Sequence, residues 1–405
     1  MLSFLWGGDA ATEPWADSGR DGAKADRVRG AVKPSVVRAL DVSALRASGF
    51  KGRLVWASSD DDEYHALRAS AFSFSAAGYP ACVTLPTDAQ DVVVLVKALR
   101  EPAQNGDVVV AVSAGKHSFL CMLDDAVNID LQRLSGAVPD LDKRVVHVLG
   151  GTKIQVVDAA LAGTGFGFVT GTNGDTGVEG LTFAGGLGFL ARLHGPACDS
   201  IVEAEVVLET GELVVCRDDN EHAMLMRALR GGGGNFGVVT RLTMELVPVS
   251  ACMGGEVIRL TPTWASARTL ASHHNAFCKT APPNLALGII FPCGVPVTVS
   301  MCVAVNAPSS ARTYADVPEL QQVYDLPGAW LRFNKMKPLD YHTQVQCLVA
   351  EHQKQLWRDS VKCRTECYNE PQTVTSQPFP PPSLASTPAN LSTSSIALLR
   401  SYSPT

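Results

Sequence analysis

The sequence lacks several features that would assign it to a class of protein at once. No apolar stretch approaches the roughly 20 residues that a membrane-spanning helix needs. The net charge of −6 offers no basic surface for nucleic acid or for an anionic membrane. The apolar start of the chain stops at Trp6 without a basic region before it, so no signal peptide is expected. We therefore expect no nucleic-acid partner and no membrane partner.

Motifs of three enzyme classes are also missing. No Gly-x-Ser-x-Gly sequence occurs, which argues against a serine hydrolase. The segment GTGFG at residues 163–167 lacks the Gly-Lys-Ser/Thr ending of a phosphate-binding loop. The strand and helix predicted after Ala81 have no Gly-rich turn between them, so they are not a dinucleotide-binding Rossmann unit.

The eleven cysteines show no Cys-x-x-Cys pair and no regular spacing. In a chain of this size the pattern favours buried free thiols and a cytoplasmic or other reducing compartment. Two groups of residues are candidates for metal ligands: Cys278 with His273 and His274, and Cys363 with Cys367. Adjacent histidines point to different sides of a helix and Cys363–Cys367 has no partners, so no metal site is expected.

Hydrophobic periodicity predicts alternating helices and strands from residue 36 onward. Residues 1–34 have no periodicity and are predicted to be flexible. Ala81–Ser118 is predicted to form a strand, a helix that begins near Asp88, and a strand over Val108–Ala111. Single elements are predicted as helices over Val36–Ala47, Lys153–Leu161 and Glu221–Leu229, and as strands over Ala126–Leu131, Arg144–Gly151, Ile201–Leu208, Leu213–Val215 and Val238–Val247. Asp60–Asp62 could cap a helix or bind a metal, and capping is favoured because carboxylates stabilise helix N-termini.

A small polar turn, Ser113–Ser118, follows the strand near residue 110. Such a turn can bring backbone amides and a histidine close to a ligand, or it can be an ordinary surface turn. Gly163–Gly195 is unusually rich in glycine, and a second run, Gly231–Gly234, follows a predicted helix. These runs indicate close contact with a flat ligand or a diphosphate, although a cluster of loops would also explain them.

Four segments together resemble the FAD-linked oxidases with the vanillyl-alcohol-oxidase, or PCMH-type, FAD-binding fold, specifically the berberine-bridge-enzyme-like branch. They are YPACVTLPTDAQDVVVLVKAL, AGKHSFLCMLDDAVNIDLQRL, TGVEGLTFAGGLGFLARLHGPACDSIVEAEVVLETGEL and MRALRGGGGNFGVVTRL. The resemblance implies an α+β fold with a two-subdomain FAD-binding domain over residues 35–250, whose core spans about 76–249. It also implies a partial α+β substrate domain with an antiparallel sheet over 251–350.

The resemblance implies that His117 is joined covalently to the 8α-methyl group of the flavin. The backbone amides of the His117 turn would bind the diphosphate, and Val238 would lie near the adenosine. Bicovalent members carry a cysteine where this chain has Asn173, so a single histidyl link is expected. The cofactor residues implied are Ser113, Ala114, Gly115, Lys116, His117, Ser118, Asn173, Thr176, Gly177, Gly180, Gly185, Gly186, Gly188 and Val238.

Two further departures from the family pattern affect the expected function. Lys116 stands where the family usually has glycine, and its side chain could clash with the flavin or pair with a phosphate. After about Glu351 the resemblance ends, the family's closing motif is absent, and residues 351–405 are predicted to be a divergent, disordered tail. Tyr341 is a candidate for the base that accepts the substrate proton, and packing in the core is the favoured alternative.

The implied function is an FAD-dependent oxidoreductase that oxidises an alcohol, sugar or amine carbon by hydride transfer. The partners would be a small-molecule substrate and O2 or another electron acceptor. The absent closing segment and Lys116 leave two alternatives open, a non-catalytic flavin-binding protein and a scaffold that binds no flavin.

Overall fold

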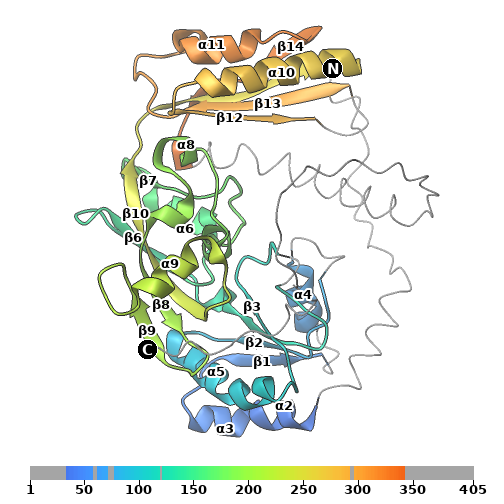
Figure 1. Cartoon of the computed structure of the whole chain (residues 1–405), viewed down its shortest axis with the longest axis vertical. Coiled ribbons are helices and arrows are strands. Elements are labelled where there is room, and N and C mark those ends of the chain that lie inside the picture. Colours follow the sequence, from blue (N-terminus) through green and yellow to red (C-terminus); the bar gives the residue numbers. More distant parts are fainter. Residues whose placement is uncertain (1–32, 58–61, 72–76, 119–120, 292–295, 343–405) are drawn as a thin grey trace, which may run out of the picture.

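The computed structural model describes residues 33–57, 62–71, 77–118, 121–291 and 296–342. Three sheets follow one another along the long axis of the molecule, each with helices packed against it (Figure 1). This mixed architecture confirms the predicted α+β class. The predictions for residues 1–32, for the tail 351–405 and for Cys363 and Cys367 lie outside the described residues.

The first sheet carries the predicted strand–helix–strand unit. Its strands are β1 (Arg53–Trp56), β2 (Cys82–Leu85), β3 (Val110–Ser113) and β4 (Val127–Asp130), in the order β1-β2-β4-β3. Strand β4 is parallel to β2 and β3, whereas β1 is antiparallel to β2. Helix α5 (Ala89–Gln104) connects β2 to β3 and begins at Asp88, whose side chain accepts a hydrogen bond from the Asp91 amide. Strand β3 begins two residues later than predicted because its pairing with β4 starts at Val110.

The predicted helix over Val36–Ala47 is wrong, since two short helices occupy this range. Helix α2 (Pro34–Ala39) ends before Asp41, and α3 (Val42–Ala47) begins after it. The Asp41 side chain accepts a hydrogen bond from the Ala44 amide at 2.8 Å, which caps the second helix and interrupts the first. Helix α4 (Asp62–Ala69) has Asp62 in its first turn, as expected for capping, whereas Asp60 and Asp61 lie outside the described residues.

The second sheet is entirely antiparallel. Its strands are β5 (Ala137–Asp140), β6 (Val145–Leu149), β7 (Phe166–Phe168), β8 (Ile201–Val207), β9 (Leu213–Cys216) and β10 (Val238–Pro248). The order is β5-β6-β10-β8-β9, with β7 paired to the end of β10. Four helices and two 3-10 turns occur along the same part of the chain. They are the helices α6 (Ile154–Leu161), α7 (Val178–Phe183), α8 (Ala191–His194) and α9 (Ala223–Gly232) and the 3-10 turns Leu131–Arg133 and Ala197–Ser200. The predicted helix at 153–161 and the predicted hairpin at 201–215 are both confirmed.

The third sheet is also antiparallel, as predicted for residues 251–350. Its strands are β11 (Cys252–Leu260), β12 (Leu285–Ile290), β13 (Val297–Ala304), β14 (Leu331–Asn334) and β15 (Lys337–Leu339). Helices α10 (Trp264–Thr280) and α11 (Pro318–Asp325), with the 3-10 turn Tyr314–Asp316, lie beyond this sheet, at the end of the molecule farthest from the first sheet (Figure 1). Arg259 of β11 is fully buried beneath α11 and donates hydrogen bonds to Ser300 Oγ at 2.6 Å and to the Val323 carbonyl. Within the described residues, none of the helices has the length and hydropathy needed to cross a membrane.

Candidate functional site

The His117 turn begins where the parallel strand β3 ends. Ser113, the last residue of β3, is buried, and its hydroxyl donates a hydrogen bond to Asn128 Oδ1 of β4 at 2.9 Å. In sheets with parallel strands, ligands commonly bind beyond the carboxyl ends of the strands. The first sheet therefore places the His117 turn at an edge where ligands commonly bind, and the hydrogen bond to Asn128 holds Ser113 in place.

Lys116 turns its side chain into the protein. The ammonium nitrogen lies 2.7 Å from Asp130 Oδ2 and donates hydrogen bonds to Ser70 Oγ at 2.7 Å and to the Leu67 carbonyl at 3.2 Å. Burial raises the pKa of Asp130, and the Lys116 charge opposes this rise. The charged end of Lys116 is thus paired within the protein, while the two roles predicted for this side chain, a clash with flavin or a pair with a phosphate, stay predictions.

Lys116 also has a backbone conformation that favours glycine. Its φ is +57°, in the left-handed region that side chains other than those of Asn and Asp rarely adopt. The strain is of the order of 1–2 kcal/mol, and a buried, well-paired side chain can hold a residue in such a conformation. The buried ion pair of Lys116 with Asp130, which we call the Lys116 anchor, therefore stabilises a backbone conformation that a glycine would adopt without strain.

His117, the next residue, is partly exposed. Its Nε2 atom lies 3.4 Å from Asp175 Oδ1, and the two side chains are 22% and 24% exposed. Asp175 belongs to the glycine-dense segment and was not among the predicted site residues. Its only sequence signal is a carboxylate between Gly174 and Gly177, in a stretch otherwise poor in charge.

The His117 turn and the glycine-dense segment are in direct contact at Gly115 and Gly177. A Cβ atom on Gly115 would lie 2.0 Å from the Gly177 amide nitrogen, and one on Gly177 would lie 2.5 Å from the Gly115 nitrogen. Backbone hydrogen bonds from Ile154 to the Thr176 carbonyl and from Val178 to the Thr152 carbonyl hold the second segment in place. The structure thus brings together two predicted cofactor segments that are about 60 residues apart in the sequence.

The other predicted glycines divide into two groups. Gly186 and Gly188 are closed by their own chain, because a Cβ on Gly188 would lie 2.0 Å from the Thr170 carbonyl and one on Gly186 would lie 2.7 Å from Ala197 Cβ. Gly180 and Gly185 have nothing within 4 Å of such an atom. The alternative of a packed loop therefore accounts for Gly186 and Gly188, and the open sides of Gly180 and Gly185 leave room for a ligand.

Polar and apolar groups beside these glycines fit an aromatic, hydrogen-bonding ligand. Asn173 Oδ1 is buried and accepts no hydrogen bond from the described residues. Leu187 is 74% exposed although it lies between two glycines of the segment. Glu179, in the first turn of α7, is buried, and desolvation raises its pKa well above the ordinary value. Sequence reasoning missed Glu179, whose only signal is that it is one of two acids, with Asp175, in the glycine-rich run.

Val238, another predicted residue, lies inside the fold. Val238 begins β10, is buried, and packs in the hydrophobic cluster of the first sheet with Val207. The second glycine run reaches the candidate site through its backbone, because the Gly233 amide donates a hydrogen bond to the Phe183 carbonyl at the end of α7. The proximity of Val238 to an adenosine stays a prediction.

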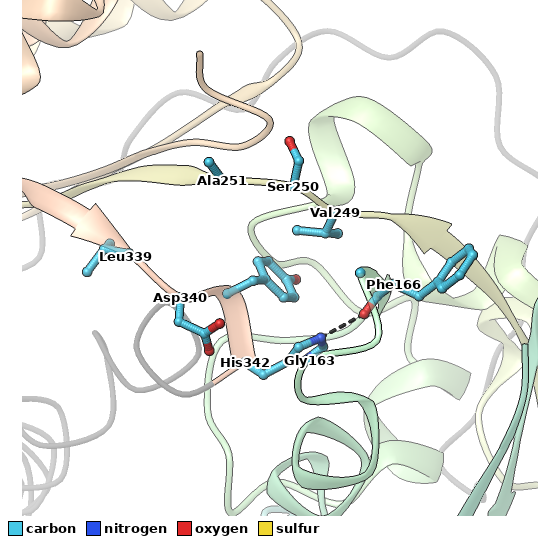
Figure 2. A pocket seen from close by; sticks show the side chains of 10 residues that line it. Gly163, Phe166, Val249, Ser250, Ala251, Leu339, Asp340 and His342 are labelled. Atoms are coloured by element: carbon cyan, nitrogen blue, oxygen red, sulfur yellow. Dashed lines mark hydrogen bonds between the residues drawn. The ribbon is translucent and has the colours of Figure 1, made fainter. Parts of the chain in front are cut away.

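Tyr341 lies in the core between the second and third sheets. Its side chain is 4% exposed, and its ring carbon Cε1 is 3.2 Å from where a Cβ on Gly167 would stand. Tyr341 lines a cavity of about 270 Å³, together with Ser250, Asp340 and His342. Figure 2 labels these three other residues. This position agrees with the packing alternative for Tyr341.

His342 connects the third sheet to the second. Its Nδ1 lies 2.9 Å from Asp158 Oδ1 of α6, and its Nε2 lies 2.7 Å from the Phe166 carbonyl (Figure 2). Burial alone would lower the pKa of His342. The hydrogen bonds to Asp158 and to Phe166 and the negative charges of Asp158 and Asp340 outweigh burial and raise it, because the imidazolium can donate to both acceptors.

We expect the His342 contact to make stability depend on pH. The pKa is higher in the folded protein than in the unfolded chain, so the stabilisation is complete below about pH 6.5 and is lost as pH rises through the folded value. Urea denaturation between pH 6 and 9 should show that His342→Gln removes about 1.5–3 kcal/mol at pH 6 and less at pH 9. His147→Gln, at a histidine whose Nδ1 lies 3.0 Å from the Thr243 hydroxyl, is the matched control. An effect of His342→Gln that is equal at all pH values would contradict the expectation.

The remaining predicted candidates have other surroundings. On α10, His273 Nδ1 lies 2.9 Å from the Thr269 carbonyl, while Cys278 Sγ lies 3.6 Å from His274 Nδ1. Burial lowers the pKa of His274. Across the described part of the chain, no three His, Cys, Asp or Glu side chains gather as they would around a metal ion.

Part of this chain is similar to known FAD-binding proteins. A family model described as "FAD binding domain" matches residues 80–217. An uncharacterized FAD-linked oxidoreductase, YgaK, of Bacillus subtilis is 30% identical over 205 residues, which cover 49% of this chain and 44% of that protein. The FAD-dependent monooxygenase FUP4 of Fusarium proliferatum is 35% identical over 196 residues, 47% of this chain and 37% of that protein.

A solved structure shares the fold. The 6-hydroxy-D-nicotine oxidase of Arthrobacter nicotinovorans superimposes with a TM-score of 0.63 and 21% identity, over 75% of this chain and 65% of that chain. The chain spans less than half the length of the two curated relatives above.

Proposed function

This chain belongs to the FAD-linked oxidases through its PCMH-type FAD binding domain, and on that premise we propose what it does. It oxidises an alcohol, sugar or amine carbon of a small molecule by hydride transfer to an FAD that is held covalently by His117. The electrons then pass to O2 or to another acceptor. The contact between Gly115 and Gly177, which joins the histidine turn to the glycine-dense segment, is the observation that carries this proposal.

The residues around this contact can each be given a part in holding the cofactor. The backbone amides of Ala114–Ser118 bind the diphosphate, and the Lys116 anchor keeps the turn in shape. Gly180 and Gly185 offer open sides to the ring system, and Asn173 Oδ1 is an acceptor that lacks a partner among the described residues. When bound, the flavin supplies the hydride-accepting ring.

The substrate base is left unassigned among the described residues. Tyr341 is buried against Gly167 and Val249, so we do not include it in the proposed site. By the family resemblance, the substrate would contact the third sheet. The single histidyl link, rather than a double one, follows from Asn173 at the position of the second attachment.

The proposal predicts a yellow protein whose flavin survives acid precipitation. His117→Ala should reduce the flavin that stays with the precipitate to background, because no covalent bond can form, while His273→Ala on the exposed face of α10 should change nothing. Absorbance of the precipitate and of the supernatant measures both populations. Purified protein that contains no flavin after expression with adequate riboflavin would contradict the proposal.

A second measurement separates an enzyme from a flavin-binding protein without activity. A panel of alcohols, sugars and amines is added without oxygen, and the flavin absorbance near the long-wavelength maximum is followed. Bleaching by any member supports hydride transfer. Bound flavin that no member bleaches favours the non-catalytic alternative.

A further inference from the structure

The two faces of the third sheet differ in what covers them. Val257 and Cys302 lie on one face and are fully buried in a hydrophobic cluster with Leu320 of α11. Side chains alternate between the faces along a strand, and residues directly opposite in an antiparallel pair share a face. The opposite face, which we call the inner face, therefore carries Cys252, Gly254, Glu256, Ile258, Leu260, Ala286, Gly288, Ile290, Val297, Val299, Met301, Val303, Leu331 and Phe333.

One half of the inner face forms the contact with the second sheet. Ala286 and Val303 are buried in the same hydrophobic cluster as Leu246 of β10, and Met301 packs against that cluster. Strand β12 contacts both α10 and α8, and Figure 1 shows it between these two helices. The inner face is therefore continuous with the contact between the third sheet and the FAD-binding domain.

The other half of the inner face is apolar and open to solvent in the described part of the chain. Phe333 and Leu331 of β14 are 46% and 51% exposed. The register places Phe333 beside Ile258 and Ile258 beside Val299. Val299 lies in turn beside Ile290, so one apolar row crosses β14, β11, β13 and β12. A contiguous apolar surface of this kind is typical of a binding site. We call it the apolar half, and its members are Ile258, Leu260, Ile290, Val297, Val299, Leu331 and Phe333.

The nearest charged residues of the inner face lie at the border between its two halves. Glu256 lies beside Met301 in the register, and its Oε2 lies 3.6 Å from Lys335 Nζ. The side chains of the apolar half include no hydroxyl, amide or charged group. A sugar bound there would lose water from hydroxyls that find no partner among these side chains, whereas a hydrocarbon would gain from burial.

We propose that the apolar half of the inner face binds the hydrocarbon body of the substrate, which makes the substrate an aromatic or alicyclic alcohol or amine and not a sugar. This inference rests on the proposed function and deepens it, because it names the class of substrate for the same site. Continuity of this face with the contact to the FAD-binding domain favours a substrate over a partner protein. Phe333 and Ile258 are then residues that determine specificity.

Three variants separate the apolar half from the rest of the sheet. Phe333→Ser replaces the aromatic side chain of the apolar half with a small polar one, and Phe333→Leu keeps its apolar character. Trp264→Ser is the matched control, because Trp264 is 75% exposed on α10, whose Phe277 packs against the cluster on the other face.

The test is equilibrium dialysis of the purified full chain against cinnamyl alcohol or glucose. We expect cinnamyl alcohol to bind at least about 10-fold more tightly than glucose, and Phe333→Ser to weaken its binding about 10-fold, as when the burial of one large apolar side chain is lost. Phe333→Leu should retain most of the binding, and Trp264→Ser should match wild type. Anaerobic bleaching of the flavin should rank the two compounds in the same order.

Four results would overturn the inference. Glucose that binds as tightly as cinnamyl alcohol is one, and unchanged binding of cinnamyl alcohol by Phe333→Ser is another. A lower urea midpoint of Phe333→Ser without weaker binding would show that the chain itself covers this face. A wild-type dimer that Phe333→Ser dissociates would show that a second copy covers it.

The dialysis also keeps this inference apart from the proposed function, because binding needs no turnover. Cinnamyl alcohol that binds through Phe333 but does not bleach the flavin would count against the proposed function, and it would support the apolar half as the binding surface.

Discussion

Replacing Lys116 by alanine should destabilise the protein by about 3–5 kcal/mol, which is the usual effect of leaving one partner of a buried ion pair alone. Lys116 and Asp130 are 3% and 0% exposed at the side chain, and their charged atoms lie 2.7 Å apart. Without the ammonium group, Asp130 must either stay charged in a dry site or take up a proton. The His117 turn would also lose the contact that fixes it. The urea concentration at the midpoint of unfolding and the amount of bound flavin should therefore both decrease.

Lys51 provides a matched control for this prediction. Its ammonium group lies 2.6 Å from Asp88 Oδ2, but the side chains are 66% and 38% exposed. Lys51→Ala should change stability far less than Lys116→Ala, because water screens an exposed pair. The double variant Lys116→Met with Asp130→Asn should recover much of the lost stability, since it removes both buried charges. Equal effects of Lys116→Ala and Lys51→Ala would contradict the buried-pair interpretation.

Gly115→Ala is the second change with a large expected effect. The added methyl carbon would stand 2.0 Å from the Gly177 nitrogen and 2.5 Å from its Cα, and both are backbone atoms that cannot rotate away. The two segments must therefore separate, at a cost of about 3 kcal/mol, the upper part of the range for overpacking. Their separation should also abolish flavin binding, measured as absorbance of the purified protein.

Two other glycines make this prediction specific. Gly234→Ala, at an exposed glycine with nothing within 4 Å of the added carbon, should leave both stability and flavin content unchanged. Gly180→Ala adds its carbon to open space on helix α7 and should not destabilise the fold, yet it should lower flavin content if that side faces the ring. Normal flavin content in Gly115→Ala would show that the contact is not needed for the site.

The order of helices and strands was largely predictable, because each depends on a local pattern. The apolar stripe of α5 and its cap at Asp88 are set within about 16 residues, and the hairpin of β8 and β9 is set by its turn. The break at Asp41 was missed because a side-chain cap competes with a continuous apolar period. The shift of β3 was missed because its start depends on pairing with β4, which comes later in the chain.

The candidate site was predictable in its segments but not in the direction of its side chains. The sequence places Lys116 beside His117 but contains no sign that its ammonium group would meet Ser70 and Asp130, which lie 46 and 14 residues away. Asp175 could be recognised only once the fold had brought it to His117. Family resemblance predicted the motif, and the contacts show that the Lys116 side chain turns into the protein whereas His117 stays partly exposed.

The order β1-β2-β4-β3 has a consequence for how the chain folds. Strand β4 fills the place between β2 and β3, although both precede it in the sequence. Until Val127–Asp130 arrive, β2 and β3 each present an unpaired edge, and the partner of Lys116 is not yet in position. The histidine turn therefore takes its shape only when the last strand of the sheet is inserted. A cofactor that needs this turn must join a domain that is already closed.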